Sequence, residues 1–356
     1  MERLTELELR VLTSLLAAGR NSEKELSDRL GMAPSNFSAV KKRLVERGVL
    51  LEEMRVNIHN IEEAQLTGFV WIEYNQPIRD RYEHLFRLYR ARLPVAMTLG
   101  SKDWSLNFDY FRTLEEAEAG RLDLAEKLRD QGLAPFLSVF TWKNVPMPLH
   151  TLRRAEARLV RYFAKGETGG EVSLERDGDA KPEITLSERK VLVALRRFPG
   201  SRLSDMAKRA GMAQSTMSEC LRSLREKNVI SNMWSLDPRR LPGVNNAVMA
   251  WVELAQPLIG KACDELAEKW ISETPQLWRL HYSPLFFCSV EFFESLDRAE
   301  EHRLRLLELF GERLGVLRYK VVPIQHLQLE YTPYFLERLF GINLVPPGTP
   351  LERQKS

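Results

Sequence analysis

The chain has few cysteines, few histidines and no metal-ligand spacing. Its three cysteines, Cys220, Cys263 and Cys288, lie far apart and form no C-x-x-C pair among the 356 residues. We therefore expect buried free thiols in a reducing cytosol, not disulfides or a zinc site. No two of the six histidines lie three or four residues apart, the spacing that would place a pair of metal ligands on one helix face. We expect no metal and no cofactor.

Long apolar runs and a strong net charge are also missing. No apolar run reaches the ~18–20 residues of a membrane helix, and the charged start Met-Glu-Arg does not resemble a signal peptide. The net charge is only +3, so any basic surface that binds nucleic acid has to be local. The sequence also contains no Gly-rich phosphate loop, nucleophile motif or paired-carboxylate signature. We predict a cytoplasmic protein that does not bind membranes and is not an enzyme.

An internal repeat organises the chain. Residues 31–50 match residues 211–230 with a constant offset, and eight of these twenty positions are identical. The same offset pairs Trp71-Ile-Glu with Trp251-Val-Glu. A constant offset over this distance indicates two tandem copies of one module. The stretch 165–183 between the copies is rich in Gly, Glu, Asp and Lys, which is typical of a solvated linker.

Each copy opens with helix signals. Thr5-x-x-Glu8 and Thr185-x-x-Glu188 fit a capping box, in which a hydroxyl and a carboxylate satisfy free backbone N–H groups. Gly31 suits a tight turn that needs a positive φ, and Pro34 suits the first position of the next helix. These signals predict three helices in a helix-turn-helix, the third running from 34 to about 47.

The third helix has an apolar stripe and a polar side. Phe37, Val40 and Leu44 recur at helical spacing and predict a buried face. The opposite side carries small hydroxyls, an amide and cations, which are groups that reach DNA phosphates and base edges. The predicted DNA-binding residues are Ser35, Asn36, Ser38, Ala39, Lys42 and Arg43 in the first copy and Gln214, Ser215, Thr216, Ser218 and Arg222 in the second.

The rest of each copy predicts an α+β domain. Residues 49–51 and 55–58 are interpreted as a short hairpin, the wing. A strand-helix-strand-strand-helix-strand order then follows in both copies, at 69–74, 78–92, 95–99, 104–111, 114–131 and 136–142, and at 247–254, 259–274, 277–281, 286–293, 296–314 and 317–324. This order is a split βαβ, or ferredoxin-like, layout. The predicted fold class is α+β, with two tandem copies of a winged helix-turn-helix followed by a ferredoxin-like βαββαβ domain.

The predicted domain boundaries follow from this pattern. They are 1–62 for the first winged helix-turn-helix, 63–164 for the first ferredoxin-like domain, 165–183 for the linker, 184–243 for the second winged helix-turn-helix, 244–340 for the second ferredoxin-like domain and 341–356 for a C-terminal tail.

The pattern Gly31-x-Ala-Pro34-Ser, followed by Lys42-Arg43-Leu, Gly48-Val-Leu and a βαββαβ domain, resembles the Lrp/AsnC family of transcription regulators. The resemblance covers nearly the whole chain, twice, whereas most members carry one copy. It implies binding of double-stranded DNA, a homo-oligomer, an archaeal or bacterial source and, in some members, a small effector. The family's effector loop has a glycine and, three residues on, an aspartate. Gly100 and Asp103 match this pattern, while Leu280–Pro284 in the second copy has neither residue.

These observations predict a sequence-specific DNA-binding transcription regulator. The two α+β domains could pair within the chain as a pseudo-dimer, because a linker raises their effective concentration. The recognition faces differ, since one offers Lys42 and Arg43 and the other Glu219 and Arg222. The chain then reads an asymmetric site, or the first copy alone binds tightly. Two alternatives stay open: a tetrapyrrole enzyme that resembles the siroheme decarboxylases, which share this architecture, and a co-regulator that does not bind DNA.

Overall fold

A computed structural model places most of the chain. It describes residues 4–17, 22–74, 95–130, 132, 136–141, 151–152, 155–168, 174–175, 181–259, 261–331 and 335–344. The helix predicted at 78–92 and most of the predicted C-terminal tail lie outside these ranges.

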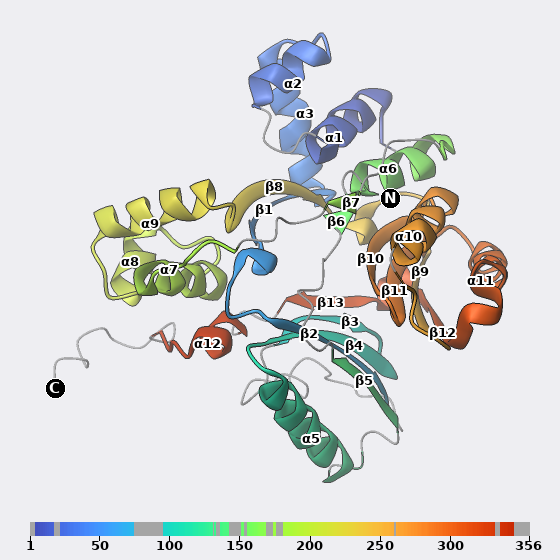
Figure 1. The fold of residues 1–356 in the computed structure, drawn as a ribbon. Coiled ribbons are helices and arrows are strands. Elements are labelled where there is room, and N and C mark those ends of the chain that lie inside the picture. Colours follow the sequence, from blue (N-terminus) through green and yellow to red (C-terminus); the bar gives the residue numbers. More distant parts are fainter. Residues whose placement is uncertain are drawn as a thin grey trace. The chain divides into compact units, whose positions relative to one another are not determined.

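The described chain contains two runs of three helices, each followed by a mixture of strands and helices (Figure 1). The helices are α1 (Glu6–Ala17), α2 (Glu23–Arg29), α3 (Pro34–Glu46), α5 (Leu114–Asp130), α6 (Ala155–Lys165), α7 (Leu186–Arg197), α8 (Leu203–Arg209), α9 (Gln214–Glu226), α10 (Ala262–Glu273), α11 (Leu296–Phe310) and α12 (Phe335–Phe340). The strands are β1 (Leu50–Val56), β2 (Leu66–Glu73), β3 (Val95–Gly100), β4 (Trp104–Phe111), β5 (Phe136–Thr141), β6 (Thr151–Leu152), β7 (Leu174–Glu175), β8 (Ile230–Leu236), β9 (Asn246–Leu254), β10 (Leu277–Ser283), β11 (Phe286–Phe293), β12 (Leu314–Pro323) and β13 (Gln328–Tyr331). The predicted fold class is confirmed.

The helix-turn-helix signals in the sequence are confirmed. Glu8 accepts from the Thr5 backbone N–H at 2.9 Å, and Thr185 and Glu188 form the corresponding capping box. The predicted turn glycine Gly31 has φ +65° with nothing near its missing Cβ, a conformation that residues with a Cβ adopt only at a cost. Helices α1–α3 and α7–α9 therefore form two helix-turn-helix units, and the apolar stripes of α3 and α9 are buried as predicted.

The chain divides into two compact units, and each unit combines elements of both repeats. The first unit contains residues 1–55, 149–177 and 232–327, so the first helix-turn-helix belongs with the second sheet. The second unit contains residues 56–148, 178–231 and 328–356, so the second helix-turn-helix belongs with the first sheet.

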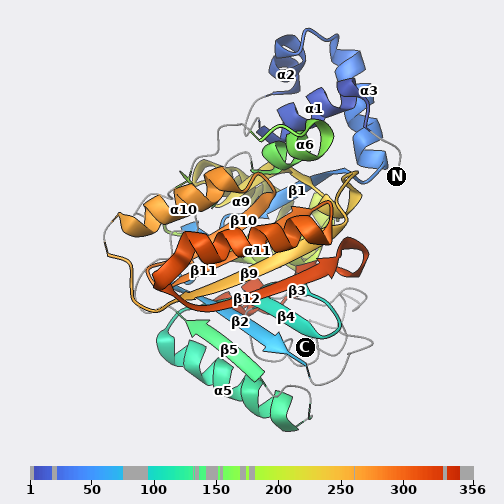
Figure 2. The same cartoon turned by 90° about the vertical axis from the view of Figure 1, so that its right-hand side faces the viewer.

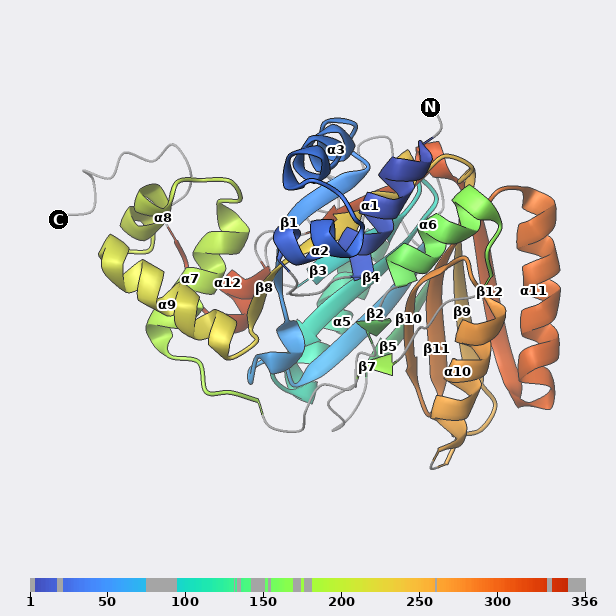
Figure 3. The same cartoon turned by 90° about the horizontal axis from the view of Figure 1, so that it is seen from above.

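The sheet of the first unit has the ferredoxin-like order β10-β11-β9-β12, with every pair antiparallel. Helices α10 and α11 pack on one face of it (Figure 3). The aromatic rings of Trp270, Phe287 and Phe310 contact one another between sheet and helices, with centroids 5.3–6.0 Å apart. Helix α6, which the sequence analysis did not separate from the first α+β domain, packs against α1 and β10 (Figure 2).

The sheet of the second unit has the order β13-β3-β4-β2-β5. Its last four strands repeat the ferredoxin-like order, and α5 packs on one face. The fifth strand, β13, was not predicted; it pairs antiparallel with β3. Helix α12 then contacts both α7 and β4, where the rings of Phe335 and Tyr110 lie 6.3 Å apart.

The predicted wing hairpin is wrong. Residues Leu50–Val56 form a single strand, β1, which pairs with β8 of the second repeat. The segment between the two predicted hairpin strands is Glu52-Glu-Met54, which lacks the Gly or Asn that a tight β-turn needs. A strand that cannot fold back on itself has to find a partner elsewhere in the chain, and β8 provides it.

Candidate nucleic-acid interface

Helix α3 turns its predicted DNA-binding side to solvent. Phe37, Val40 and Leu44 are buried, which fixes the rotation of the helix about its axis. The exposed residues include every predicted position: Ser35, Asn36, Ser38, Ala39, Lys42 and Arg43. The structure thus gathers these side chains on one polar surface of the first unit.

The basic residues at 41–43 have different surroundings in the fold. Lys41 forms an ion pair with Glu23 of α2, and its ammonium lies 5.4 Å from the centre of the Trp234 ring. Lys42 points outward, with 76% of its side chain exposed and only a 3.7 Å pair to Glu46. Lys42 is therefore better placed than Lys41 to reach a phosphate.

Helix α9 places the second predicted set in a similar way. Gln214, Ser215, Ser218 and Arg222 are exposed, and Thr216 is half-buried. The Ser218 hydroxyl donates to the Gln214 carbonyl at 3.0 Å, so this hydroxyl is engaged with its own helix. Arg222 lies 4.0 Å from Glu226, and 76% of its side chain is exposed.

Both recognition helices begin without a side-chain cap. Their N-cap residues are Ala33 and Ala213, neither of which makes a side-chain hydrogen bond, and neither helix has an acid in its first turn. By contrast, α1 and α7 begin at capping boxes that start with Thr5 and Thr185. Uncapped N–H groups and the positive end of the helix dipole favour an anion such as a DNA phosphate.

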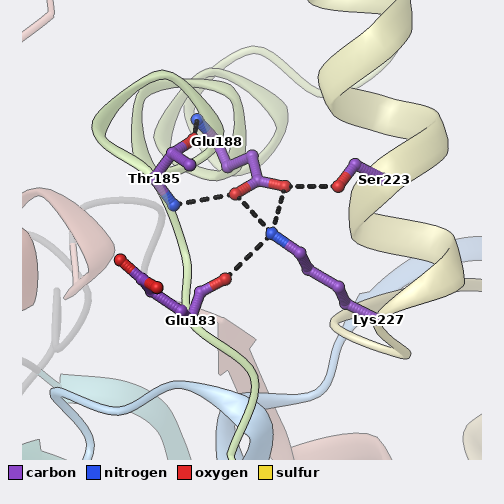
Figure 4. A network of polar contacts seen from close by, with 5 residues as sticks. All are labelled: Glu183, Thr185, Glu188, Ser223 and Lys227. Atoms are coloured by element: carbon purple, nitrogen blue, oxygen red, sulfur yellow. Dashed lines mark hydrogen bonds and ion pairs between the residues drawn. The ribbon is translucent and has the colours of Figure 1, made fainter.

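A buried carboxylate connects the C-terminal end of each recognition helix to the first helix of the same helix-turn-helix. In the second unit, Glu188 accepts from Lys227 at the C-cap of α9 at 2.8 Å and from the Ser223 hydroxyl at 2.7 Å (Figure 4). Lys227 also donates to the Glu183 carbonyl at 2.8 Å. Burial alone would raise the pKa of Glu188, but the hydrogen bonds from Lys227, Ser223 and Thr185 outweigh it and lower this pKa to about 2.

The first unit repeats this contact with different chemistry. Arg47, the C-cap of α3, donates to Glu8 at 3.1 Å, and the Arg43 guanidinium lies 3.8 Å from the same carboxylate. Burial opposes ionisation of Glu8, but hydrogen bonds from Thr5 and the charge of Arg47 outweigh it, so the pKa of Glu8 is lowered. The sequence analysis predicted only the capping role of these glutamates. The sequence did contain a signal for these ion pairs, because an acid at 8 and 188 recurs together with a cation at 47 and 227.

The predicted effector residues lie in the β3–β4 turn of the second unit. Gly100 pairs with Gln328 of β13 on one side and Ser105 of β4 on the other. The Asp103 carboxylate accepts from the Ser101 hydroxyl, and its backbone carbonyl accepts from the Tyr74 N–H at 2.8 Å. Asp103 is exposed to solvent, and effector binding by Gly100 and Asp103 stays a prediction.

One face of the first unit's sheet carries two rows of residues with cationic or imidazole ends. Arg279, Val290, Met249 and Lys320 are paired across the four strands, as are His281, Cys288, Trp251 and Arg318. Directly paired residues point to the same side of a sheet. The ends of both rows therefore lie on the edge strands β10 and β12, with buried apolar side chains between them.

The structure identifies no metal cluster in the described ranges: no three His, Cys, Asp or Glu side chains there are grouped to hold an ion. The three cysteines are free and buried, as predicted. Among the described helices, none is both long and apolar enough to cross a bilayer.

Residues 4–50 match the model of a family described as winged helix-turn-helix DNA-binding. This match supports DNA binding by the first helix-turn-helix and covers a small part of the chain. No curated protein sequence matches the chain at a significant level.

Solved structures that match the chain include those of an enzyme and of transcription regulators. The siroheme decarboxylase NirDL is 14% identical, covers 94% of this chain and 97% of its own, and gives a TM-score of 0.48. Its complex with an iron-uroporphyrin III analogue gives 13%, the same coverage and 0.49. AsnC of E. coli is 15% identical over 40% of this chain and 93% of its own, with a TM-score of 0.29.

The prediction that the chain is not an enzyme is corrected by this comparison. Both NirDL structures, which match the chain over nearly its whole length, are structures of an enzyme. The regulator AsnC matches 40% of the chain. The sequence prediction rested on missing nucleophile, phosphate-loop and paired-carboxylate motifs, and their absence excludes only the enzyme classes that use them.

Proposed function

We propose that this chain binds double-stranded DNA through the exposed sides of α3 and α9 and regulates transcription. The single observation that carries this proposal is the polar, solvent-facing surface of both recognition helices. The buried apolar stripe of each helix anchors it to the other two helices. At its C-terminal end, a cation also pairs with a buried glutamate of the first helix. The uncapped helix N-termini add partial positive charge where DNA backbone would approach.

The two recognition surfaces are not equivalent, so the chain is proposed to read an asymmetric site. Lys42 on α3 corresponds to Arg222 on α9, but Ala39 corresponds to Glu219. An exposed carboxylate repels phosphate and accepts a hydrogen bond from a cytosine amino group, whereas a methyl side chain does neither. We further propose that the two α+β domains pair as an intrachain pseudo-dimer and that the chain forms a homo-oligomer.

Binding to DNA is tested by fluorescence anisotropy between 50 and about 300 mM salt. The probes are duplexes from the DNA upstream of the gene that encodes this chain, and a scrambled duplex. We expect affinity that falls steeply with salt, because phosphate contacts release counterions. Lys42→Ala and Arg222→Ala should weaken binding unequally. Absence of binding at the lowest salt contradicts the proposal, and equal losses on a symmetric site contradict the asymmetry.

A second candidate is a tetrapyrrole decarboxylase, favoured by the two residue rows on the first unit's sheet. A tetrapyrrole is a flat apolar ring with peripheral carboxylates. The rows place apolar Trp251 and Met249 between Arg318, Lys320 and the β10 edge, about 14 Å across at the usual strand spacing. Arg318 pairs with Glu253 at 2.7 Å, so this arginine would exchange partners on binding.

This candidate is tested by titrating the purified chain with an iron-uroporphyrin III analogue and recording the Soret band. Saturable binding that Arg318→Ala weakens about tenfold, together with release of carbon dioxide from siroheme, would support the enzyme. An unchanged spectrum at high micromolar concentrations would contradict it. Exposed Arg129→Ala is the matched control, because it removes the same charge from the surface of α5.

A further inference from the structure

The two helix-turn-helix units carry different charge balances. Residues 184–230 contain ten Lys and Arg against four Asp and Glu, whereas residues 4–50 contain eight against six. The sequence match between the repeats makes these segments comparable position by position. The second helix-turn-helix is therefore clearly the more basic one.

At three exposed positions the second repeat has a cation where the first repeat has an uncharged or acidic side chain. Arg202 stands where the first repeat has Ser22, Lys208 where it has Asp28, and Arg225 where it has Val45. All six side chains are exposed. Arg202 and Lys208 lie at the two ends of α8, and Arg225 lies in the last turn of α9, on the side that also carries Arg222.

Carboxylates compensate most cations of the first recognition helix. Lys41 pairs with Glu23, Lys42 with Glu46, and Arg47 with Glu8. A paired cation gains less from a phosphate, because the carboxylate has to be displaced or repelled first.

The second helix-turn-helix lacks this compensation at the three positions. Within the described ranges, Arg202, Lys208 and Arg225 form no ion pair with an acid within 4 Å, while the equivalent of Arg47, Lys227, is again paired with its buried glutamate. Three exposed cations without carboxylate partners can each neutralise a phosphate and release a counterion.

We infer that the second helix-turn-helix is the main phosphate anchor of the chain. Arg202, Lys208 and Arg225 hold the DNA backbone and supply most of the salt-dependent affinity, and the first helix-turn-helix supplies less of it. This inference rests on the proposed DNA binding and identifies the half of the molecule that dominates it. It is the reverse of the alternative in which the first copy alone binds tightly.

The experiment compares two triple variants that each remove three positive charges. One is Arg202→Ser with Lys208→Ser and Arg225→Ser. The other is Lys24→Ser with Arg29→Ser and Lys42→Ser, all exposed residues of the first helix-turn-helix. Affinity for one duplex is measured from 50 to about 300 mM salt, and thermal melting confirms that both variants fold as the parent chain does.

We expect the first triple to lower the slope of log K against log salt by about 2 to 3, at about 0.9 per phosphate contact. The matched triple should lower it by about 1 or less, although it includes Lys42. A gain variant, Asp28→Lys, should raise affinity, because it gives the first repeat one cation of the second.

The outcomes separate the inference from the proposed function. If the parent chain binds duplex DNA and the matched triple loses as much slope as the first triple or more, the inference is overturned and DNA binding stands. If the parent chain shows no salt-sensitive binding to any duplex, the proposed function itself fails and the inference fails with it.

Discussion

The carboxylate of Glu188, in the first turn of α7, lies 2.8 Å from the ammonium of Lys227 at the C-cap of α9. Only 4% of the Glu188 side chain is exposed, so its carboxylate is shielded from water, whereas 28% of the Lys227 side chain is exposed. The glutamate serves two purposes, because it caps its own helix through Thr185 and holds the far end of the recognition helix. The orientation of α9 therefore depends on a charge near the start of α7.

Glu188→Gln should lower the free energy of unfolding by about 1.5–3 kcal/mol at pH 7, since it weakens hydrogen bonds to a charged group. The pKa of Glu188 is about 2 in the fold against an ordinary 4.5. A lowered pKa means that the folded state favours the ionised form. Its contribution is thus fully present above pH 4.5 and is lost as the pH falls toward 2.

Urea unfolding of both proteins at pH 7 and pH 3 checks this prediction. The difference between parent and Glu188→Gln should shrink at pH 3. Glu300→Gln, which alters an exposed pair with Arg303, should leave stability nearly unchanged. A difference that grows on acidification would refute the assigned role.

His302→Ala should destabilise the first unit by about 1–3 kcal/mol, the cost of removing a partner from a buried polar group. His302 Nδ1 lies 2.9 Å from Glu291 Oε2, and the Glu291 side chain is fully buried beneath α10 and α11. Removing the imidazole leaves a buried carboxylate without this partner, which is costlier than losing a surface pair. Thermal and urea unfolding give the value, with exposed Arg303→Ala as the control. A loss below about 1 kcal/mol would show that the contact is not needed.

Asp109→Asn should make the second unit less sensitive to rising pH. Asp109 on β4 is 1% exposed, one of its oxygens has no hydrogen-bond partner, and burial raises its pKa from 3.8 to about 7. A raised pKa means that the folded state favours the protonated acid. Stability therefore falls as the pH rises from about 4 through 7, and asparagine removes this loss.

Melting temperatures of parent and Asp109→Asn between pH 4 and 8 test this sign. The variant should be the more stable one at pH 8, by about 1–3 kcal/mol, and the two should converge at pH 4. Asp123→Asn on α5, where Asp123 pairs with Lys127, is the control and should show no such trend. Parallel curves for parent and Asp109→Asn would contradict the prediction.

Lys41→Ala and Lys42→Ala should separate structure from DNA contact. Lys41 pairs with Glu23 and packs over Trp234, so its loss should cost about 0.5–1 kcal/mol of stability. Lys42 is exposed, so its loss should leave stability unchanged and lower the salt slope of DNA binding by about 0.9. Unfolding curves and anisotropy on the same samples measure both quantities. The reverse pattern would mean that Lys41 is the phosphate contact.

The candidate interface was largely predictable because helix signals are local. The buried stripe of Phe37, Val40 and Leu44 determined which side of α3 faces solvent, and every predicted residue of that helix is exposed. The different roles of Lys41 and Lys42 were not predictable. They depend on Glu23 and Trp234, which reach α3 only through tertiary packing.

The sequence by itself determined where the helices begin, which of their sides are buried and how the strands are ordered in each repeat. These features depend on hydrogen bonds and side-chain spacing within a few residues, as at Thr185 and Gly31. The tertiary structure alone decided that β1 pairs with β8, that β13 extends the sheet of the first repeat and that each compact unit combines both repeats. A strand's backbone groups accept any partner edge within reach, so the choice depends on contacts between residues far apart in the chain.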